Sequence, residues 1–113
     1  MSAESANDSK WIAQLKEGDR LTFANIFNLY GKELYEFASR TIYTKEDCEE
    51  IVQDVFVSLW ERREELEIDS LRAYLFTSVK YKVIRYIKHL AVRRKYEEHY
   101  RHFESNYIAP VEP

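Results

Sequence analysis

The sequence predicts an all-α fold, a compact bundle of about four helices of which the last is long and basic. Apolar residues recur at spacings of three and four along several segments, which is the period of an amphipathic helix. Only two glycines and two prolines interrupt the 113 residues, so long helices are expected. The chain is 45% hydrophobic and 15% aromatic, enough for one modest core that buries roughly two thirds of the unfolded surface.

The predicted helical domain covers residues 8–103. Residues 1–7 are small and polar, and we expect a flexible N-terminus there. A first short helix is expected to be capped by Asp8 or Ser9 and to stop at Gly18. Residues 104–113 carry Pro110 and Pro113 in a short polar tail, which is typical of the start of a linker.

The second predicted helix begins after Asp19, a good N-cap residue, and runs from Arg20 to about Tyr43. Its apolar stripe consists of Phe23, Ile26, Phe27, Tyr30, Leu34, Phe37 and Ala38. Gly31 lies in the middle of the helix, where it costs about 1 kcal/mol relative to alanine. We therefore expect close packing at that position.

The third predicted helix is acidic and runs from Thr44 to about Glu65, because Thr44 followed by Asp47 resembles a capping box. Its core face holds Cys48, Ile51, Val52, Val55, Phe56 and Leu59, and its other face holds Glu49, Glu50, Gln53, Asp54, Val57, Trp60 and Glu61. Val57 and Trp60 among carboxylates are typical of a protein interface with a charged rim. The alternative is that Trp60 packs under the following loop and the charges only solubilise the helix.

The fourth predicted helix is basic and begins after Asp69 or Ser70. Its buried stripe is Leu75, Phe76, Val79, Val83, Tyr86, Ile87 and Leu90, and the opposite side carries Tyr74, Thr77, Ser78, Lys80, Tyr81, Lys82, Arg85, Lys88 and His89. Aromatic side chains interspersed with basic ones are typical of a site for single-stranded nucleic acid. The basic side chains neutralise phosphates, and the aromatic rings stack on unpaired bases. The alternative is a solvated basic face with incidental tyrosines.

Two adjacent segments carry opposite charge. Residues 44–69 hold ten acidic side chains against three basic ones, whereas residues 72–102 hold nine basic side chains against two acidic ones. This asymmetry indicates one surface for a polyanion and another for a different partner.

Several classes of protein do not fit the sequence. Cys48 is the single cysteine, so it allows no internal disulfide, and it lies on the core face of its helix. The three histidines have no spacing known for a metal site, and no glycine-rich phosphate loop occurs. We expect no catalysis, no metal and no cofactor. No apolar run approaches the roughly 20 residues of a membrane span, so we expect a cytoplasmic protein without a membrane partner.

The run from Asp47 to Phe56, Asp-Cys-Glu-Glu-Ile-Val-Gln-Asp-Val-Phe, resembles region 2 of extracytoplasmic-function sigma factors, which are bacterial transcription-initiation subunits of the sigma-70 family. That family has Asp-Ala-Glu-Asp, two residues, Gln-Glu or Gln-Asp, one residue and Phe. Trp60 fits its aromatic position, and the stretch from Leu71 to Lys80 is similar to the segment that opens promoter DNA. The resemblance covers about residues 8 to 100.

The resemblance implies a helical domain whose acidic helix docks on the clamp helices of the largest subunit of core RNA polymerase. The implied polymerase contacts are Glu50, Gln53, Asp54, Val57 and Trp60. The basic helix would bind promoter DNA, mainly the non-template single strand of the minus-ten element, through Tyr74, Lys80, Tyr81, Arg85 and Lys88. An anti-sigma factor is a further implied partner, and catalysis belongs to core polymerase.

The sequence departs from the family pattern in places. Tyr81 follows Lys80 where the family often has Asn, and Arg85 precedes Tyr86 where it often has Asp, so promoter specificity does not transfer. The loop that precedes Leu71 is short, although a neighbouring loop forms much of the flipped-base pocket in the family. The second domain of such sigma factors, region 4, is absent from this sequence. The competing interpretation is a small helical protein-protein adaptor with an acidic Trp60 interface and no DNA role.

Overall fold

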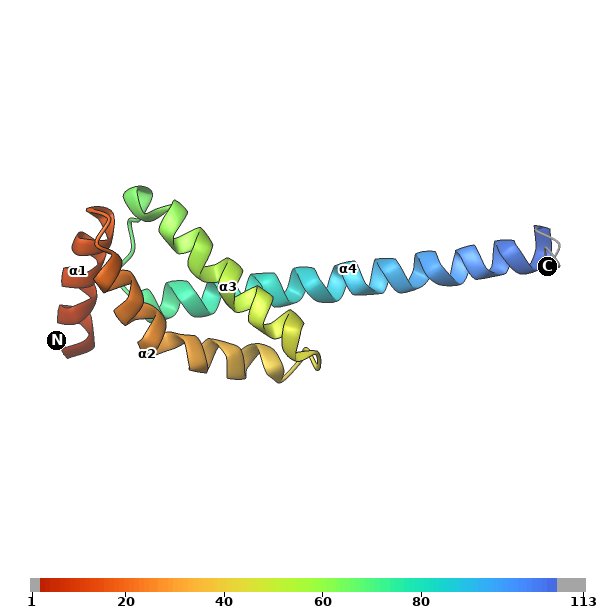
Figure 1. The fold of residues 1–113 in the computed structure, drawn as a ribbon, viewed down its shortest axis with the longest axis horizontal. Helices are drawn as coiled ribbons and strands as arrows, with labels where there is room; N and C mark the ends of the chain where they lie inside the picture. The colour runs from red at the N-terminus through yellow and green to blue at the C-terminus, as the bar shows by residue number, and fades with distance from the viewer. Residues whose placement is uncertain (1–2, 108–113) are drawn as a thin grey trace. The chain divides into compact units, whose positions relative to one another are not determined.

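The computed structural model describes residues 3–107, with side chains for residues 7–102, and these residues are helical with short connections (Figure 1). The elements are α1 (Ala3–Lys16), α2 (Arg20–Ser39), α3 (Lys45–Glu61), the 3₁₀ turn η1 (Arg63–Glu65) and α4 (Leu71–Tyr107). The described residues contain no strand, so the all-α prediction is confirmed. The prolines of the predicted linker, Pro110 and Pro113, lie outside the described residues.

The chain divides into two compact units, Met1–Val83 and Ile84–Pro113. The first unit contains α1, α2, α3, η1 and the beginning of α4, and the second contains the rest of α4. No helix among the described residues combines the length and the apolar character that a membrane crossing requires.

The turn between α1 and α2 forms as predicted. Gly18 has a φ of 84°, in the left-handed region that glycine tolerates best, and its amide donates to the Leu15 carbonyl at 2.9 Å. Asp19 then caps α2, because its Oδ1 accepts hydrogen bonds from the amides of Leu21 at 3.0 Å and Thr22 at 3.3 Å. The two caps fix where α1 ends and α2 begins.

The beginning of α1 differs from the prediction. The helix starts at Ala3, so neither Asp8 nor Ser9 is its N-cap. Asp8 is instead 2% exposed, and its Oδ2 accepts a hydrogen bond from the amide of Leu71, the first residue of α4, at 2.9 Å. Ser70 is a cap as predicted, since its Oγ accepts from the amide of Ala73 at 3.1 Å.

The core of the first unit lies between α2, α3 and the first turns of α4, with Leu15 contributed by α1. Buried positions include Ile26, Tyr30, Leu34 and Ala38 of α2, all six predicted core residues of α3, and Leu71, Leu75, Val79 and Val83 of α4. The rings of Phe37 and Phe76 meet edge to face at 5.8 Å, which joins α2 to α4. Arg72 also reaches Glu33 of α2 at 2.7 Å.

Two residues of the predicted stripes are exposed. Phe27 on α2 is 43% exposed and Ile87 on α4 is 42% exposed, so neither is a core residue. Ile87 belongs to the second unit, where Ala91 to His102 are all exposed. A helical period shows which residues share a face, but burial also requires a neighbouring element on that face.

Candidate functional site

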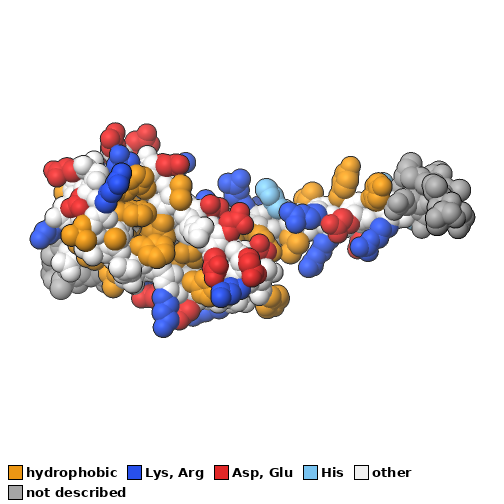
Figure 2. Space-filling model, in the orientation of Figure 1, with side chains coloured by type: hydrophobic (Ala, Val, Ile, Leu, Met, Phe, Trp, Pro, Cys, Tyr) orange, Lys and Arg blue, Asp and Glu red, His pale blue; other side chains and the backbone are white. Residues whose placement is uncertain are grey.

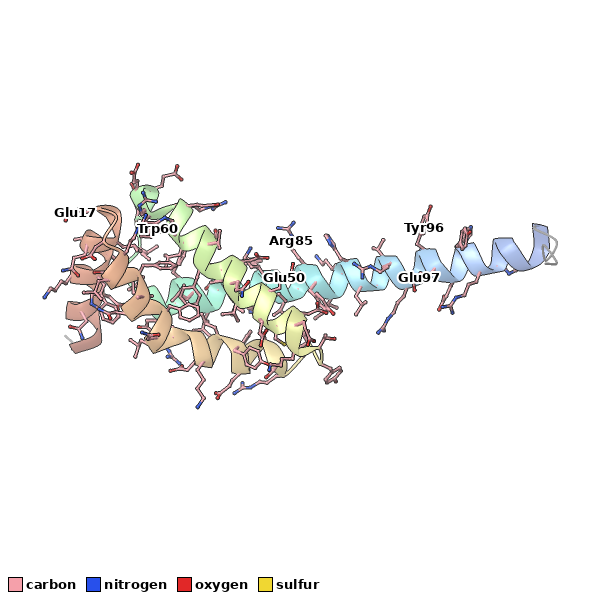
Figure 3. The ribbon with its side chains drawn as sticks, in the orientation of Figure 1. Glu17, Glu50, Trp60, Arg85, Tyr96 and Glu97 are labelled. Carbon is pink, nitrogen blue, oxygen red and sulfur yellow. The ribbon has the colours of Figure 1, made fainter. Side chains whose placement is uncertain are left out.

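The outward face of α3 carries the predicted polymerase contacts. Core packing of Cys48, Val52 and Val55 turns the opposite side of the helix to solvent. Glu50, Gln53, Asp54 and Val57 are all exposed on that side, whereas Trp60 is half-buried. Figure 3 shows Glu50 in the first half of α3 and Trp60 near its end. Four of the five predicted residues therefore form one accessible strip along the helix.

The start of α3 is only partly as predicted. Thr44 occupies the N-cap position and has extended backbone angles, but its side chain makes no cap hydrogen bond. Its carbonyl accepts the first helical bond from the amide of Cys48 at 3.1 Å. Glu46 and Asp47 stand in the first turn, where negative charge stabilises the helix dipole. Thr44 therefore holds the predicted N-cap position, but its side chain does not accept the hydrogen bond expected of a capping box.

Trp60 is held from two sides. Its ring lies 5.3 Å from the ring of Phe23 on α2, in an edge-to-face arrangement. The guanidinium carbon of Arg63, in η1, lies 4.3 Å from the centre of the Trp60 ring, and Nη1 of Arg63 donates to the Trp60 carbonyl at 2.9 Å. Trp60 therefore packs against the turn that follows it, and its remaining surface is held in a fixed orientation.

Two open hollows flank this strip between α2 and α3. The Trp60 hollow, about 420 Å³, is lined by Arg20, Phe23, Val57, Trp60 and Glu61. The Gly31 hollow, about 370 Å³, is lined by Phe27, Asn28, Gly31, Lys32, Tyr35, Glu49, Val52 and Gln53. Figure 2 shows an apolar patch over α2 and α3 beside a group of carboxylates. This face can receive an apolar side chain and offers negative charge around it.

Sequence reasoning missed three residues beside Trp60: Arg20 and Phe23, which line the Trp60 hollow, and Arg63, which packs on the Trp60 ring. The helical stripe predicts Phe23 in the core, whereas its side chain is only half-buried. The signal for Arg63 was its position three residues after Trp60, a spacing at which side chains on a helical turn meet. Arg20 has no sequence signal of its own, because only the packing of α2 against α3 brings it near Trp60.

The predicted DNA-binding residues of the first unit lie on the beginning of α4. Tyr74 and Tyr81 are two turns apart and share one side of the helix, at about 100° per residue, while Lys80 lies about 100° from Tyr81. Tyr81 is 65% exposed and Lys80 is exposed, whereas Tyr74 is half-buried. Tyr74 lines an open depression of about 400 Å³, which we call the Tyr74 hollow. Its other lining residues are Ile68, Asp69, Ser70, Ala73 and Thr77.

The other two predicted DNA-binding residues, Arg85 and Lys88, lie in the second unit and are exposed. No ion pair within the described residues neutralises Lys80, Arg85 or Lys88. Their charges are therefore available to an anion.

Metal-ligating and nucleophilic side chains also occur among the described residues. Among the described residues, no three His, Cys, Asp or Glu side chains gather as a metal ion would require. Cys48 is buried, and its Sγ donates to the Ile42 carbonyl at 3.2 Å. Burial raises the pKa of the Cys48 thiol, and the carboxylates of Asp47 and Glu49 raise it further. A buried neutral thiol is a poor nucleophile.

Comparison with known proteins gives one match. The family described as Sigma-70 region 2 matches residues 26–93, which include most of α2, all of α3 and α4 as far as Arg93. No curated protein and no solved structure matches the chain. The matched residues make up more than half of the chain and contain all ten predicted contact residues. The chain therefore belongs to the sigma-70 region 2 family, the domains with which sigma factors bind RNA polymerase and recognise promoters.

Proposed function

We propose that this chain is the polymerase-docking and promoter-opening domain of an extracytoplasmic-function sigma factor. The observation that carries the proposal is the exposed strip of Glu50, Gln53, Asp54 and Val57 within the matched residues. The family match supports a sigma factor, and the Asp47 to Phe56 pattern supports this subtype. The domain would act in the cytoplasm, where core polymerase works.

The docking partner in this proposal is the pair of clamp helices of the largest polymerase subunit. A helix laid along α3 would cover Val57, which is 52% exposed, and reach the Trp60 hollow with an apolar side chain. Asp54 and Glu50 would stand at the rim, where charges speed association and select a basic partner. An anti-sigma factor that covers the same strip would compete with polymerase.

The DNA partner is the non-template strand of the minus-ten element. Tyr74, Lys80 and Tyr81 in the first unit, with Arg85 and Lys88 in the second, would bind phosphates and unpaired bases. Base stacking on a ring contributes about 1–3 kcal/mol, comparable to the mean of about 1.4 kcal/mol per stacked base-pair step. Capture of each base therefore offsets about one step of strand opening.

The Tyr74 hollow is the candidate pocket for a flipped base. Its volume of about 400 Å³ lies within the range of about 300–1,000 Å³ for small-molecule sites. Its lining includes the hydroxyls of Ser70 and Thr77 and the carboxylate of Asp69, which are groups that can hydrogen-bond a base edge. The domain only holds the open strand, and core polymerase performs the chemistry.

The test is a pull-down of the 113-residue chain against purified bacterial core polymerase. Asp54→Arg together with Gln53→Ala should abolish binding, while Glu36→Arg, a charge reversal at an exposed position of α2, should leave it unchanged. Circular dichroism checks that both variants keep their helicity. Unchanged binding by the double variant would sink the docking assignment. If the parent chain also fails to bind, the adaptor interpretation leads.

A further inference from the structure

The second unit carries an aromatic and basic strip that the proposed function uses only at its beginning. We define the tyrosine strip as Arg85, His89, Val92, Arg93, Tyr96 and Tyr100 of α4. At about 100° per residue, all six lie within about 60° of the direction of Tyr96. Figure 3 shows Arg85 and Tyr96 on the same edge of α4 and Glu97 toward the other. The strip therefore forms one continuous side of the helix.

The rings of this strip face solvent. Tyr96 is 75% exposed, Tyr100 is 55% exposed and Val92 is 66% exposed. The family match ends at residue 93, so both tyrosines lie beyond it. Within the described residues, Arg85 and Arg93 form no ion pair. A helix without packing against its apolar side is only marginally stable in water, so a bound partner would stabilise this part of α4.

The charge of the second unit indicates the kind of partner. Residues 84–102 contain six Lys or Arg side chains and two acidic ones. Both acidic residues, Glu97 and Glu98, fall outside the tyrosine strip, at about 100° and 160° from Tyr96. A polyanion is the partner that this distribution attracts.

We propose that the tyrosine strip binds single-stranded DNA, with Tyr96 and Tyr100 each stacking on one base and Arg85 and Arg93 contacting phosphates. Tyr96 and Tyr100 are four residues apart, about 6 Å along the helix axis. The two rings are therefore far enough apart to stack on different bases of one strand. The inference rests on the proposed function, because it takes the same ligand, the single strand of an opened promoter.

Two other partners fit less well. A second copy of this chain paired through this side would bring two copies of Arg85 and Arg93 together, and their like charges disfavour that pairing. A lipid surface prefers Trp, Phe and Leu on the apolar side of a helix, whereas the tyrosine strip presents two tyrosines, two arginines, one histidine and one valine. Both partners are nevertheless included in the test, because each would leave a distinct signature.

The experiment measures fluorescence anisotropy of a labelled 20-nucleotide single strand with the 113-residue chain at fixed salt. Tyr96→Ala with Tyr100→Ala should weaken binding by at least about tenfold. Tyr96→Phe with Tyr100→Phe should bind the single strand as tightly as the parent chain does, because stacking needs the ring and not the hydroxyl. Tyr43→Ala, at a 94% exposed tyrosine in the first unit, is the matched control and should change nothing. Duplex DNA of the same sequence should bind more weakly, and its affinity should not change when Tyr96 and Tyr100 are replaced.

A second pair of variants tests the arginine positions. Arg93→Gln should weaken binding more than Arg94→Gln. Both substitutions remove one positive charge, but Arg94 lies about 160° from Tyr96 and therefore outside the tyrosine strip. Equal losses, or parent affinity in the double tyrosine variant, would overturn the proposal in favour of diffuse electrostatic attraction. Light scattering detects a dimer of the chain, and flotation with phosphatidylglycerol vesicles detects binding to a lipid surface. A dimer or vesicle contact that depends on the tyrosines, without any effect on DNA binding, also overturns it.

Polymerase binding separates this inference from the proposed function. The double tyrosine variant should bind core polymerase like the parent chain. If the parent chain binds no polymerase but its single-strand affinity still depends on Tyr96 and Tyr100, the proposed function fails and the tyrosine strip stands.

Discussion

The carboxylate of Asp8 in α1 accepts a hydrogen bond from the backbone amide of Leu71, which begins α4, at 2.9 Å. The two residues are 63 positions apart and both are buried. The first amides of a helix have no partner within it, and an anion there also suits the helix dipole. Ser70 satisfies a second amide, that of Ala73. An N-terminal helix outside the matched family residues therefore anchors the start of the proposed DNA-binding helix.

Asp8→Ala should lower the free energy of unfolding by about 1–3 kcal/mol, because it leaves the Leu71 amide buried without an acceptor. Ser9→Ala, at the exposed neighbouring position, should change it by less than about 0.5 kcal/mol. Urea denaturation followed by circular dichroism measures both. An Asp8→Ala variant as stable as Ser9→Ala would show that water replaces the carboxylate.

Gly31→Ala should stabilise the fold by about 0.5–1 kcal/mol. The expectation of close packing at this glycine is wrong, because an added Cβ would meet only the Phe27 ring at 3.8 Å, an ordinary contact. Alanine also loses less chain entropy in a helix than glycine does.

Gly18→Ala is the matched control, and it should destabilise the fold. Its φ of 84° would cost an alanine roughly 1–2 kcal/mol. Thermal unfolding of both variants gives the comparison. A lower melting temperature for Gly31→Ala would mean that the Gly31 hollow is tighter than its contacts indicate.

Val57→Ala and Trp60→Ala should separate docking from stability. Val57 is exposed, so its truncation should weaken polymerase binding and change the unfolding free energy by less than about 0.5 kcal/mol. Trp60→Ala should weaken binding and also destabilise the fold by roughly 1–2 kcal/mol, because Phe23 and Arg63 pack on its ring. Pull-down and urea denaturation on the same samples measure the two effects. A stability loss for Val57→Ala would place that side chain in the core.

Cys48 should react slowly with a disulfide reagent such as DTNB in the native state and rapidly in urea. Burial raises the pKa of its thiol above the ordinary value of 9.0, and a raised pKa means less thiolate at a given pH. Between pH 9.0 and the native pKa, the Cys48 thiol therefore stays protonated in the folded state and ionises in the unfolded state. The stabilisation is complete below pH 9.0 and declines as the pH rises through the native pKa. Parent chain and Cys48→Ala should diverge in stability above pH 9.0, and equal native and unfolded reaction rates would contradict the burial.

The periodic residues were the predictable part of this protein. The core faces of α2, α3 and the beginning of α4 follow from spacings of three and four, and Gly18 with Asp19 marks a boundary through backbone chemistry alone. The exposed strip of Gln53 and Asp54 was also predictable, because residues opposite a core face must point outward. Most of the unpredictable parts involve contacts between distant segments, such as Asp8 with Leu71 and Phe23 with Trp60.

Sequence alone therefore determined which segments are helical, their buried sides, the charge asymmetry and the motif from Asp47 to Phe56. The predicted ends of two helices are wrong, because α2 ends at Ser39 and not near Tyr43, and α3 ends at Glu61 and not near Glu65. Tertiary structure decided that Asp8 caps α4, that Phe23 packs on Trp60, and that Ile87 remains exposed. The physical reason is the range of the interactions. Helical period and caps act within about four residues, whereas burial and a cap from a distant residue depend on which elements meet in space.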